Sequence, residues 1–137
     1  MRIGRKITCP VALALVRIPM AKPRRAMNQR LATLADNAGV TPVAHGGQNW
    51  QDFTTFEAVA LGVGGADFYK KALVQLDPAS VSSPTMEKVL ATFKRIKGYT
   101  DKNASGRDWN LATAMVVKGE AGMQIMGDWA KGEFIAA

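Results

Sequence analysis

The sequence predicts an α/β fold that is mostly helical, with a small sheet. Apolar side chains repeat at helical spacing over several stretches, which indicates amphipathic helices. Two short apolar runs, Thr41 to Ala44 and Ala121 to Met126, lie between turn-forming residues and are typical of strands. Because two short strands have few partners within the chain, we expect a small sheet with open edges.

A helix, a strand and a turn are predicted before residue 49. Leu31 to Asn37 suits a helix that ends at Gly39. Thr41 to Ala44 then suits a strand that runs into a turn at His45-Gly46-Gly47, since paired glycines favour chain reversal.

The next segment predicts two helices separated by glycines. Asn49 and Asp52 are suitable N-terminal residues for a helix that continues to the Gly64-Gly65 break, and Ala66 to Leu73 suits a shorter helix. The apolar face expected for the first of them contains Phe53, Phe56, Ala60 and Leu61.

Ser83-Pro84 opens the helix with the clearest pattern. A serine cap followed by proline is favoured at a helix start, and Gly98 is the expected stop. The basic residues Lys94, Arg95 and Lys97 lie outside the apolar face or near the helix end. That face contains Met86, Val89, Leu90, Phe93 and Ile96.

The last segment predicts a helix, a strand and a second helix. Asp108 is a suitable N-cap and Gly119 a left-handed stop, so Trp109 falls in the first turn of a short helix. After the strand, a Gly127-Asp128 turn leads into a helix that Trp129 opens. The apolar face of the short helix contains Leu111, Ala112, Met115 and Val116.

The charge of the chain is unevenly distributed. The 137 residues have a net charge of +7, but residues 1–30 contain 8 basic residues and no acidic one, whereas residues 31–137 contain 10 basic and 11 acidic residues, a net charge of −1. The part expected to fold is therefore nearly neutral and lacks the basic face of a nucleic-acid-binding domain. We expect no nucleic-acid partner.

Residues 1–30 are interpreted as a basic leader or non-homologous tail without a fixed structure. They fit a signal peptide poorly, because Pro10 and Arg17 confine the apolar run and Pro19 stands where a cleavage site needs a small residue. The segment is also too short and too charged for a membrane span. We favour a truncated reading frame with a leftover or out-of-frame leader; a disordered basic tail is the alternative.

Residues for metal or catalytic chemistry are scarce. The chain has one histidine, His45, and one cysteine, Cys9, so we expect no metal site, no cofactor and no Cys/His catalytic pair. A glycosidase-like pair of Asp108 and Asp128 is an alternative that spacing leaves open. We expect a binding protein rather than an enzyme.

Two tryptophans stand at helix starts where ligands commonly bind. Trp129 follows the carboxyl end of a strand, the edge at which open α/β sheets bind their ligands, and Trp109 opens the preceding helix. A flat indole suits the C–H-rich face of a sugar ring, and the neighbouring Asp128 can accept hydrogen bonds from its hydroxyls. The alternative is that the tryptophans only pack in the core and the aspartates only cap helices.

Two segments carry a resemblance to a known family. Residues 119–130 resemble the G-x-A-x-M-x-x-x-G-x-W signature of family 1 extracellular solute-binding proteins, the sugar-capturing receptors of bacterial ABC importers. The His-Gly-Gly-Gln-x-Trp stretch within residues 41–52 is most similar to the glucose/mannose-type periplasmic members. The resemblance extends from about Leu31 to Phe134. It implies that residues 31–137 are a partial carboxyl-terminal lobe of a two-lobed type II periplasmic-binding-protein fold.

The resemblance also implies a function and a location. Family members are periplasmic receptors without enzymatic activity; they close two lobes on a monosaccharide such as glucose or mannose and dock on importer permease subunits. A single lobe is expected to bind far more weakly. The alternative is a small helical interaction protein whose basic tail contacts anionic lipid or nucleic acid. The expected sugar-binding residues are Trp109, Trp129, Asp128, His45, Gln48 and Trp50.

Overall fold

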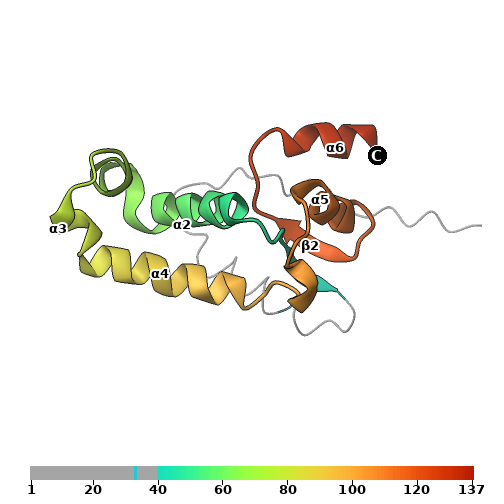
Figure 1. The fold of residues 1–137 in the computed structure, drawn as a ribbon, viewed down its shortest axis with the longest axis horizontal. Helices are drawn as coiled ribbons and strands as arrows, with labels where there is room; N and C mark the ends of the chain where they lie inside the picture. Colours follow the sequence, from blue (N-terminus) through green and yellow to red (C-terminus); the bar gives the residue numbers. More distant parts are fainter. Residues whose placement is uncertain (1–32, 34–39) are drawn as a thin grey trace, which may run out of the picture.

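A computed structural model describes Thr33 and residues 40–137, and within them the predicted class is confirmed: a mostly helical α/β fold with parallel strands (Figure 1). The predictions for residues 1–30 and for the helix over residues 31–37, Thr33 apart, lie outside the described residues. The elements are β1 (Thr41–Ala44), α2 (Asn49–Tyr69), a π-helical turn (Lys70–Val74), α3 (Pro78–Val81), α4 (Pro84–Lys97), a 3-10 turn (Lys102–Ala104), α5 (Trp109–Val117), β2 (Ala121–Gln124) and α6 (Ala130–Ala136).

The two strands pair in parallel and bring three helix starts to one edge. Thr41 pairs with Ala121 and Ala44 with Gln124, so the carboxyl ends of both strands meet at the same edge. β1 continues there through a turn into α2, and β2 continues into α6. The start of α5 lies at this edge too, because the Gln124 side-chain amide donates to the Trp109 carbonyl at 3.0 Å.

Most of the core lies between α2 and α4, which run side by side away from the sheet (Figure 1). Phe56 and Phe93 meet edge to face in this layer, with ring centroids 6.1 Å apart. A smaller cluster of alanines, Ala44, Ala112 and Ala121, joins α5 to the sheet, and these short side chains allow close approach. The buried residues of the larger cluster are Val59, Ala60, Ala72, Met86, Val89 and Ile96.

The structure corrects the prediction for α2. Its N-cap is Gln48 rather than Asn49, whereas the predicted break at Gly64-Gly65 is confirmed, because Gly65 has non-helical backbone angles, φ of +83° and ψ of +173°, and divides the α2 range into two helices at a kink. Phe53 is 53% exposed and Leu61 42% exposed, so both were wrongly assigned to the buried face. The reason is that part of this face is polar: Gln51 and Thr55 occupy buried positions that the apolar pattern could not identify.

The segment after the Gly65 kink agrees with the shorter helix predicted over residues 66–73. It is α-helical to Tyr69 and continues as the π-helical turn from Lys70 to Val74. Helix α3 comes next and is capped by Asp77, whose side chain accepts from the Ser80 amide at 3.0 Å.

Helix α4 agrees with its predicted bounds. Ser83 caps it by accepting the Met86 amide at 3.3 Å, and Gly98 follows its last residue. One predicted core residue, Leu90, is instead 51% exposed, because only a narrow stripe of α4 faces α2.

The carboxyl-terminal elements follow the predicted order with shorter bounds. β2 ends at Gln124 rather than Met126, and Gly119 has the expected positive φ, +74°. Leu111 is 56% exposed and does not belong to the buried face of α5. Asp108 occupies the N-cap position of α5, but its side chain makes no capping hydrogen bond because it is engaged elsewhere.

Candidate functional site

An exposed pair of tryptophan rings marks the carboxyl edge of the sheet. Trp50 lies in the first turn of α2 and Trp129 is the N-cap of α6, so each follows the end of one strand. Their ring centroids are 6.3 Å apart and the rings are tilted by 51°. Trp50 is 41% exposed and Trp129 50% exposed, so both offer indole surface to solvent.

Gly127 is the surface on which the Trp129 ring rests. A Cβ atom at position 127 would lie only 2.1 Å from the ring, so any side chain there would displace the indole. The position of Trp129 therefore depends on the absence of a side chain at Gly127.

A chain of hydrogen bonds fixes the orientation of the second ring. The Trp50 Nε1–H donates to Gln48 Oε1 at 2.7 Å, and Gln48 Nε2 donates to Asp108 Oδ1 at 2.7 Å. An indole N–H can only donate and a carboxylate can only accept, so these two partners determine which way the Gln48 amide faces. This contact is also the reason that Asp108 does not cap α5.

The other two predicted residues of this edge lie apart from the ring pair. Asp128 is exposed in the turn before α6, and its carboxylate makes no hydrogen bond to the described residues. Trp109 is partly buried as the first residue of α5, and its carbonyl accepts from the Thr113 hydroxyl at 3.1 Å. Among the described aromatic residues, the ring contacts do not include Trp109.

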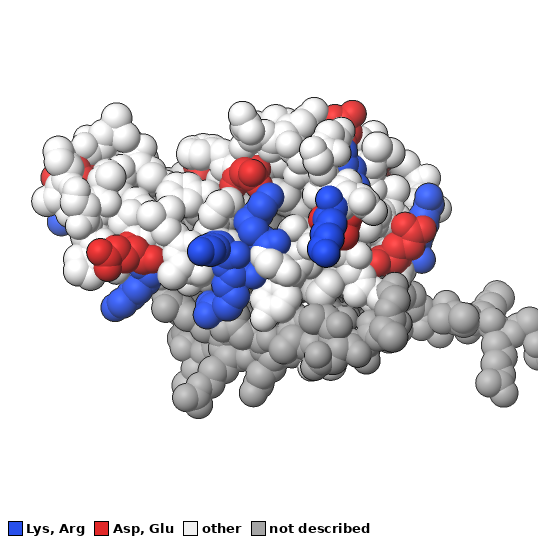
Figure 2. Space-filling view, turned by 60° about the horizontal axis from the view of Figure 1, so that its bottom comes forward, with Lys and Arg blue, Asp and Glu red and all other residues white. Residues whose placement is uncertain are grey.

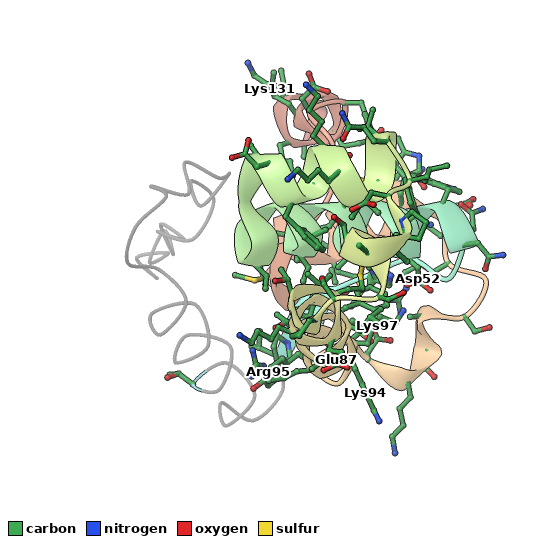
Figure 3. The ribbon with its side chains drawn as sticks, turned by 90° about the vertical axis from the view of Figure 1, so that its left-hand side faces the viewer. Asp52, Glu87, Lys94, Arg95, Lys97 and Lys131 are labelled. Atoms are coloured by element: carbon green, nitrogen blue, oxygen red, sulfur yellow. The ribbon has the colours of Figure 1, made fainter. Side chains whose placement is uncertain are left out.

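His45 points inward beneath the turn. It is 2% exposed, and its Nε2 lies 2.7 Å from Asp52 Oδ1, the same oxygen to which Lys97 donates at 2.6 Å. Asp52 and Lys97 lie next to one another in Figure 3. Because an ionised carboxylate can only accept, the His45 proton that faces Asp52 lies on Nε2. The imidazole therefore ties the turn after β1 to α2 and to the end of α4.

The surroundings shift the pKa values of both acid–base partners. Burial lowers the pKa of His45, and this effect outweighs the hydrogen bond to Asp52, which raises it. For Asp52, burial raises the pKa, but hydrogen bonds from Lys97 and His45 together lower it below its usual value. The network therefore favours a neutral imidazole beside an ionised carboxylate.

Acidification should weaken the fold through His45. A histidine whose pKa is lower when folded takes up its proton more readily in the unfolded state, so stability is retained above a pH of about 6.5 and falls below it. Urea unfolding followed by circular dichroism at pH 8, 7, 6 and 5 measures this. His45→Gln should cost about 1–3 kcal/mol at pH 8 and remove most of the slope between pH 7 and 5. An equal slope in the variant would contradict the assignment.

A second clamp holds the loop between α4 and α5. This clamp is the pair Arg107 and Asp101. Arg107 donates two hydrogen bonds to the carboxylate, Nη1 to Oδ2 at 2.6 Å and Nη2 to Oδ1 at 2.7 Å, and its Nη1 also donates to the His45 carbonyl at 3.1 Å. The hydrogen bond from Arg107 lowers the pKa of Asp101, and the same contact raises that of Arg107. This pair was not predicted from the sequence, although an acid and an arginine in one short polar loop were the available signal.

The turn after β1 presses directly on this loop. The Gly47 amide donates to the Arg107 carbonyl at 3.0 Å, and a Cβ atom at Gly47 would lie 2.3 Å from the Ala104 carbonyl oxygen. Gly47 therefore permits the backbone contact that places Gln48 beside Asp108.

Neither charge dominates the described part of the face that Figure 2 shows. Basic and acidic side chains are interspersed on the face in Figure 2. Among the described residues, no group of three potential metal ligands occurs, and no described helix is long and apolar enough to cross a membrane.

An α/β domain that gathers aromatic rings and helix starts at the carboxyl edge of its sheet is characteristic of ligand-binding domains. The model of the family "Bacterial extracellular solute-binding protein" matches residues 29–137, and the chain belongs to this family. The prediction of a binding protein rather than an enzyme is thereby confirmed at the level of the family.

Individual relatives agree with this family. The chain is 59% identical over 103 residues to a "Probable sugar-binding periplasmic protein" of Mesorhizobium japonicum, which covers 75% of this chain and 25% of the relative. It is 56% identical over 110 residues to a protein of the same description from Brucella suis, and this match covers 78% of the chain and 26% of the relative. An uncharacterised ABC transporter extracellular-binding protein of Pyrococcus horikoshii is 41% identical over 99 residues, and this match covers 72% of the chain and 22% of the relative. The chain thus spans about a quarter of the length of these relatives.

A solved structure supports the fold. The chain is similar to the bacterial solute receptor AcbH, described as having an exclusive preference for β-D-galactopyranose, with a TM-score of 0.69 and 23% identity. The match covers 80% of this chain and 28% of the receptor. The described elements therefore correspond to part of a solute receptor.

Proposed function

We propose that this chain supplies part of the sugar site of an ABC-importer receptor, at the edge that presents Trp50 and Trp129. The observation that supports this most is the exposed ring pair, 6.3 Å apart, with Gln48 and Asp108 beside it. The names of the bacterial relatives, probable sugar-binding periplasmic proteins, agree with this assignment.

The proposed chemistry combines stacking with hydrogen bonding. A sugar ring has an apolar face that packs on an indole, and it has hydroxyls that need partners once they leave water. Trp129 offers the exposed ring face, and the exposed carboxylate of Asp128, which has no hydrogen-bond partner among the described residues, can accept from hydroxyls. Gln48 holds Trp50 in place, and the start of α5 brings the Trp109 backbone to the same edge of the sheet. His45 enters this proposal as a support for the turn, because its nitrogen is engaged with Asp52.

We further propose an aldohexose as the ligand, glucose or mannose in the first place. The sequence resemblance to the glucose/mannose type favours these sugars, whereas the galactopyranose preference belongs to the similar but more distant receptor. Residues 31–137 would then be a partial carboxyl-terminal lobe, periplasmic in location, whose intact form docks on importer permease subunits. The alternative of an interaction protein with a basic tail depends on residues 1–30, which lie outside the described residues.

The affinity of this chain for a sugar should be low. It spans about a quarter of its relatives, so most of the hydroxyls of a bound hexose would still face water, and closure of a second lobe would add nothing. We expect a dissociation constant of roughly 1 mM or weaker. Nanomolar glucose binding by the 137-residue chain would contradict this expectation.

A pair of glycine variants tests the proposed site. Gly127→Ala should push the Trp129 ring off its support, because the new methyl group would overlap it, and should weaken hexose binding by about tenfold. Saturation-transfer NMR with glucose measures the loss. The matched control is Gly132→Ala in α6, where a Cβ atom meets nothing within 4 Å, so binding should be unchanged. Equal binding by both variants would overturn the assignment of Trp129 as the stacking ring.

A further inference from the structure

A buried amide lies directly beneath the hydrogen-bond chain at the ring pair. Gln51, in the first turn of α2, is 0% exposed. Its Nε2 donates to Gln48 Oε1 at 3.1 Å and to the Arg107 carbonyl at 3.3 Å. It thereby joins the turn after β1 to the loop before α5, the two segments that bring Gln48 to Asp108.

The side-chain amide of Gln51 uses its Nε2 donor but not its Oε1 acceptor. A Cβ atom at Gly46 would lie 1.9 Å from Gln51 Oε1, so the glycine leaves room for the amide. That oxygen has no hydrogen-bond partner within the part of the chain that the structure describes. A buried acceptor without a partner destabilises a fold. An apolar side chain of similar shape would fill the same space without this cost. The Nε2 donor is what an apolar side chain could not supply.

We infer that Gln51 is a positioning residue for Gln48 and, through it, for the Trp50 ring. Gln48 Oε1 receives two donors, the Trp50 indole and the Gln51 amide, while Gln48 Nε2 faces Asp108. Two donors on the oxygen and one acceptor at the nitrogen hold the amide in one orientation. Without Gln51 the Gln48 oxygen loses its hydrogen bond from this buried amide, and the Gln48 side chain rotates more freely. The effect on sugar binding rests on the proposed function, whereas the effect on Trp50 does not.

The test uses the chain free of sugar. Gln51→Met keeps the length of the side chain and removes both hydrogen bonds. The chain has three tryptophans, so its NMR spectrum should show three indole N–H signals, which Trp50→Phe assigns. In Gln51→Met the Trp50 signal should move upfield and broaden as its acceptor becomes mobile, while the Trp109 signal stays in place. Hexose binding should weaken by roughly fivefold.

A control and a second variant keep the test decisive. Thr55→Val removes another buried polar group of α2, one without a hydrogen-bond partner among the described residues, and should leave the Trp50 signal unchanged. Gly46→Ala should reproduce the Trp50 change by displacing the Gln51 amide, which serves if Gln51→Met fails to fold. A Trp50 signal identical to that of the wild type in a folded Gln51→Met or Gly46→Ala variant would overturn the inference. A shifted Trp50 signal in a chain that binds no sugar would uphold it and reject the proposed function instead.

Discussion

Gly47→Ala is expected to destabilise the chain by about 3 kcal/mol, the upper end of the usual cost of overpacking. The new Cβ atom would lie 2.3 Å from the Ala104 carbonyl oxygen and 2.4 Å from the Gly106 nitrogen. Both are backbone atoms, which cannot rotate away as the end of a side chain can. The turn after β1 and the loop before α5 must therefore separate, and the hydrogen bond from Gly47 to Arg107 is lost with them.

Chemical denaturation monitored by circular dichroism measures this loss. Gly132→Ala is the matched control, because a Cβ atom at that position in α6 meets nothing within 4 Å. Alanine is the better helix former by about 0.5–1 kcal/mol, so this control should be as stable as the wild type or more so. If Gly47→Ala unfolds at the same denaturant concentration as Gly132→Ala, the close contact between turn and loop does not exist in solution.

Arg107→Met is the second substitution with a large expected effect, a loss of about 3–5 kcal/mol. The guanidinium side chain is 14% exposed and the Asp101 carboxylate 19%, so the methionine would leave a largely buried carboxylate without its cation. The hydrogen bond to the His45 carbonyl would also be lost. The loop that presents Asp108 to Gln48 should loosen as a result.

The pH dependence of Arg107→Met provides a second measurement. In the wild type the pKa of Asp101 is lowered, so this part of the stability is present above pH 3.8 and is lost as the pH falls through the lowered value. The variant should therefore differ most from the wild type at neutral pH and least in strong acid. Arg95→Met, an exposed arginine of α4, is the control and should change stability by less than about 0.5 kcal/mol. Similar losses in both variants would contradict the role of the clamp.

The local elements of this fold could be predicted because their signals are local. Ser83 and Gly98 bound α4 as expected, and the short apolar run at Thr41–Ala44 forms β1. The buried face of α2 could not be predicted, because Gln51 is buried for its hydrogen bonds rather than for its hydrophobicity. Exposed apolar residues such as Phe53 follow from the same cause, since polar side chains occupy positions that the pattern assigned to apolar ones.

The candidate site was predictable only in part. The placement of Trp129 after a strand end followed from the sequence, and so did the capping position of Asp108. The pairing of Trp129 with Trp50 did not, because it depends on the parallel register of two strands that are about 80 residues apart. The hydrogen bond between Gln48 and Asp108 likewise joins residues 60 positions apart, and a contact between such distant residues cannot be predicted from the spacing of apolar residues.

The most direct test of the proposed sugar site is a fluorescence titration of the 137-residue chain with glucose, mannose and galactose, with circular dichroism on the same sample. Three tryptophans give the signal, and two of them, Trp50 and Trp129, form the exposed pair. The proposal predicts a weak but saturable change on a folded background, stronger for glucose or mannose than for galactose and reduced in Gly127→Ala. A folded chain whose fluorescence responds to none of the three sugars, at concentrations up to about 100 times the expected dissociation constant, would contradict it.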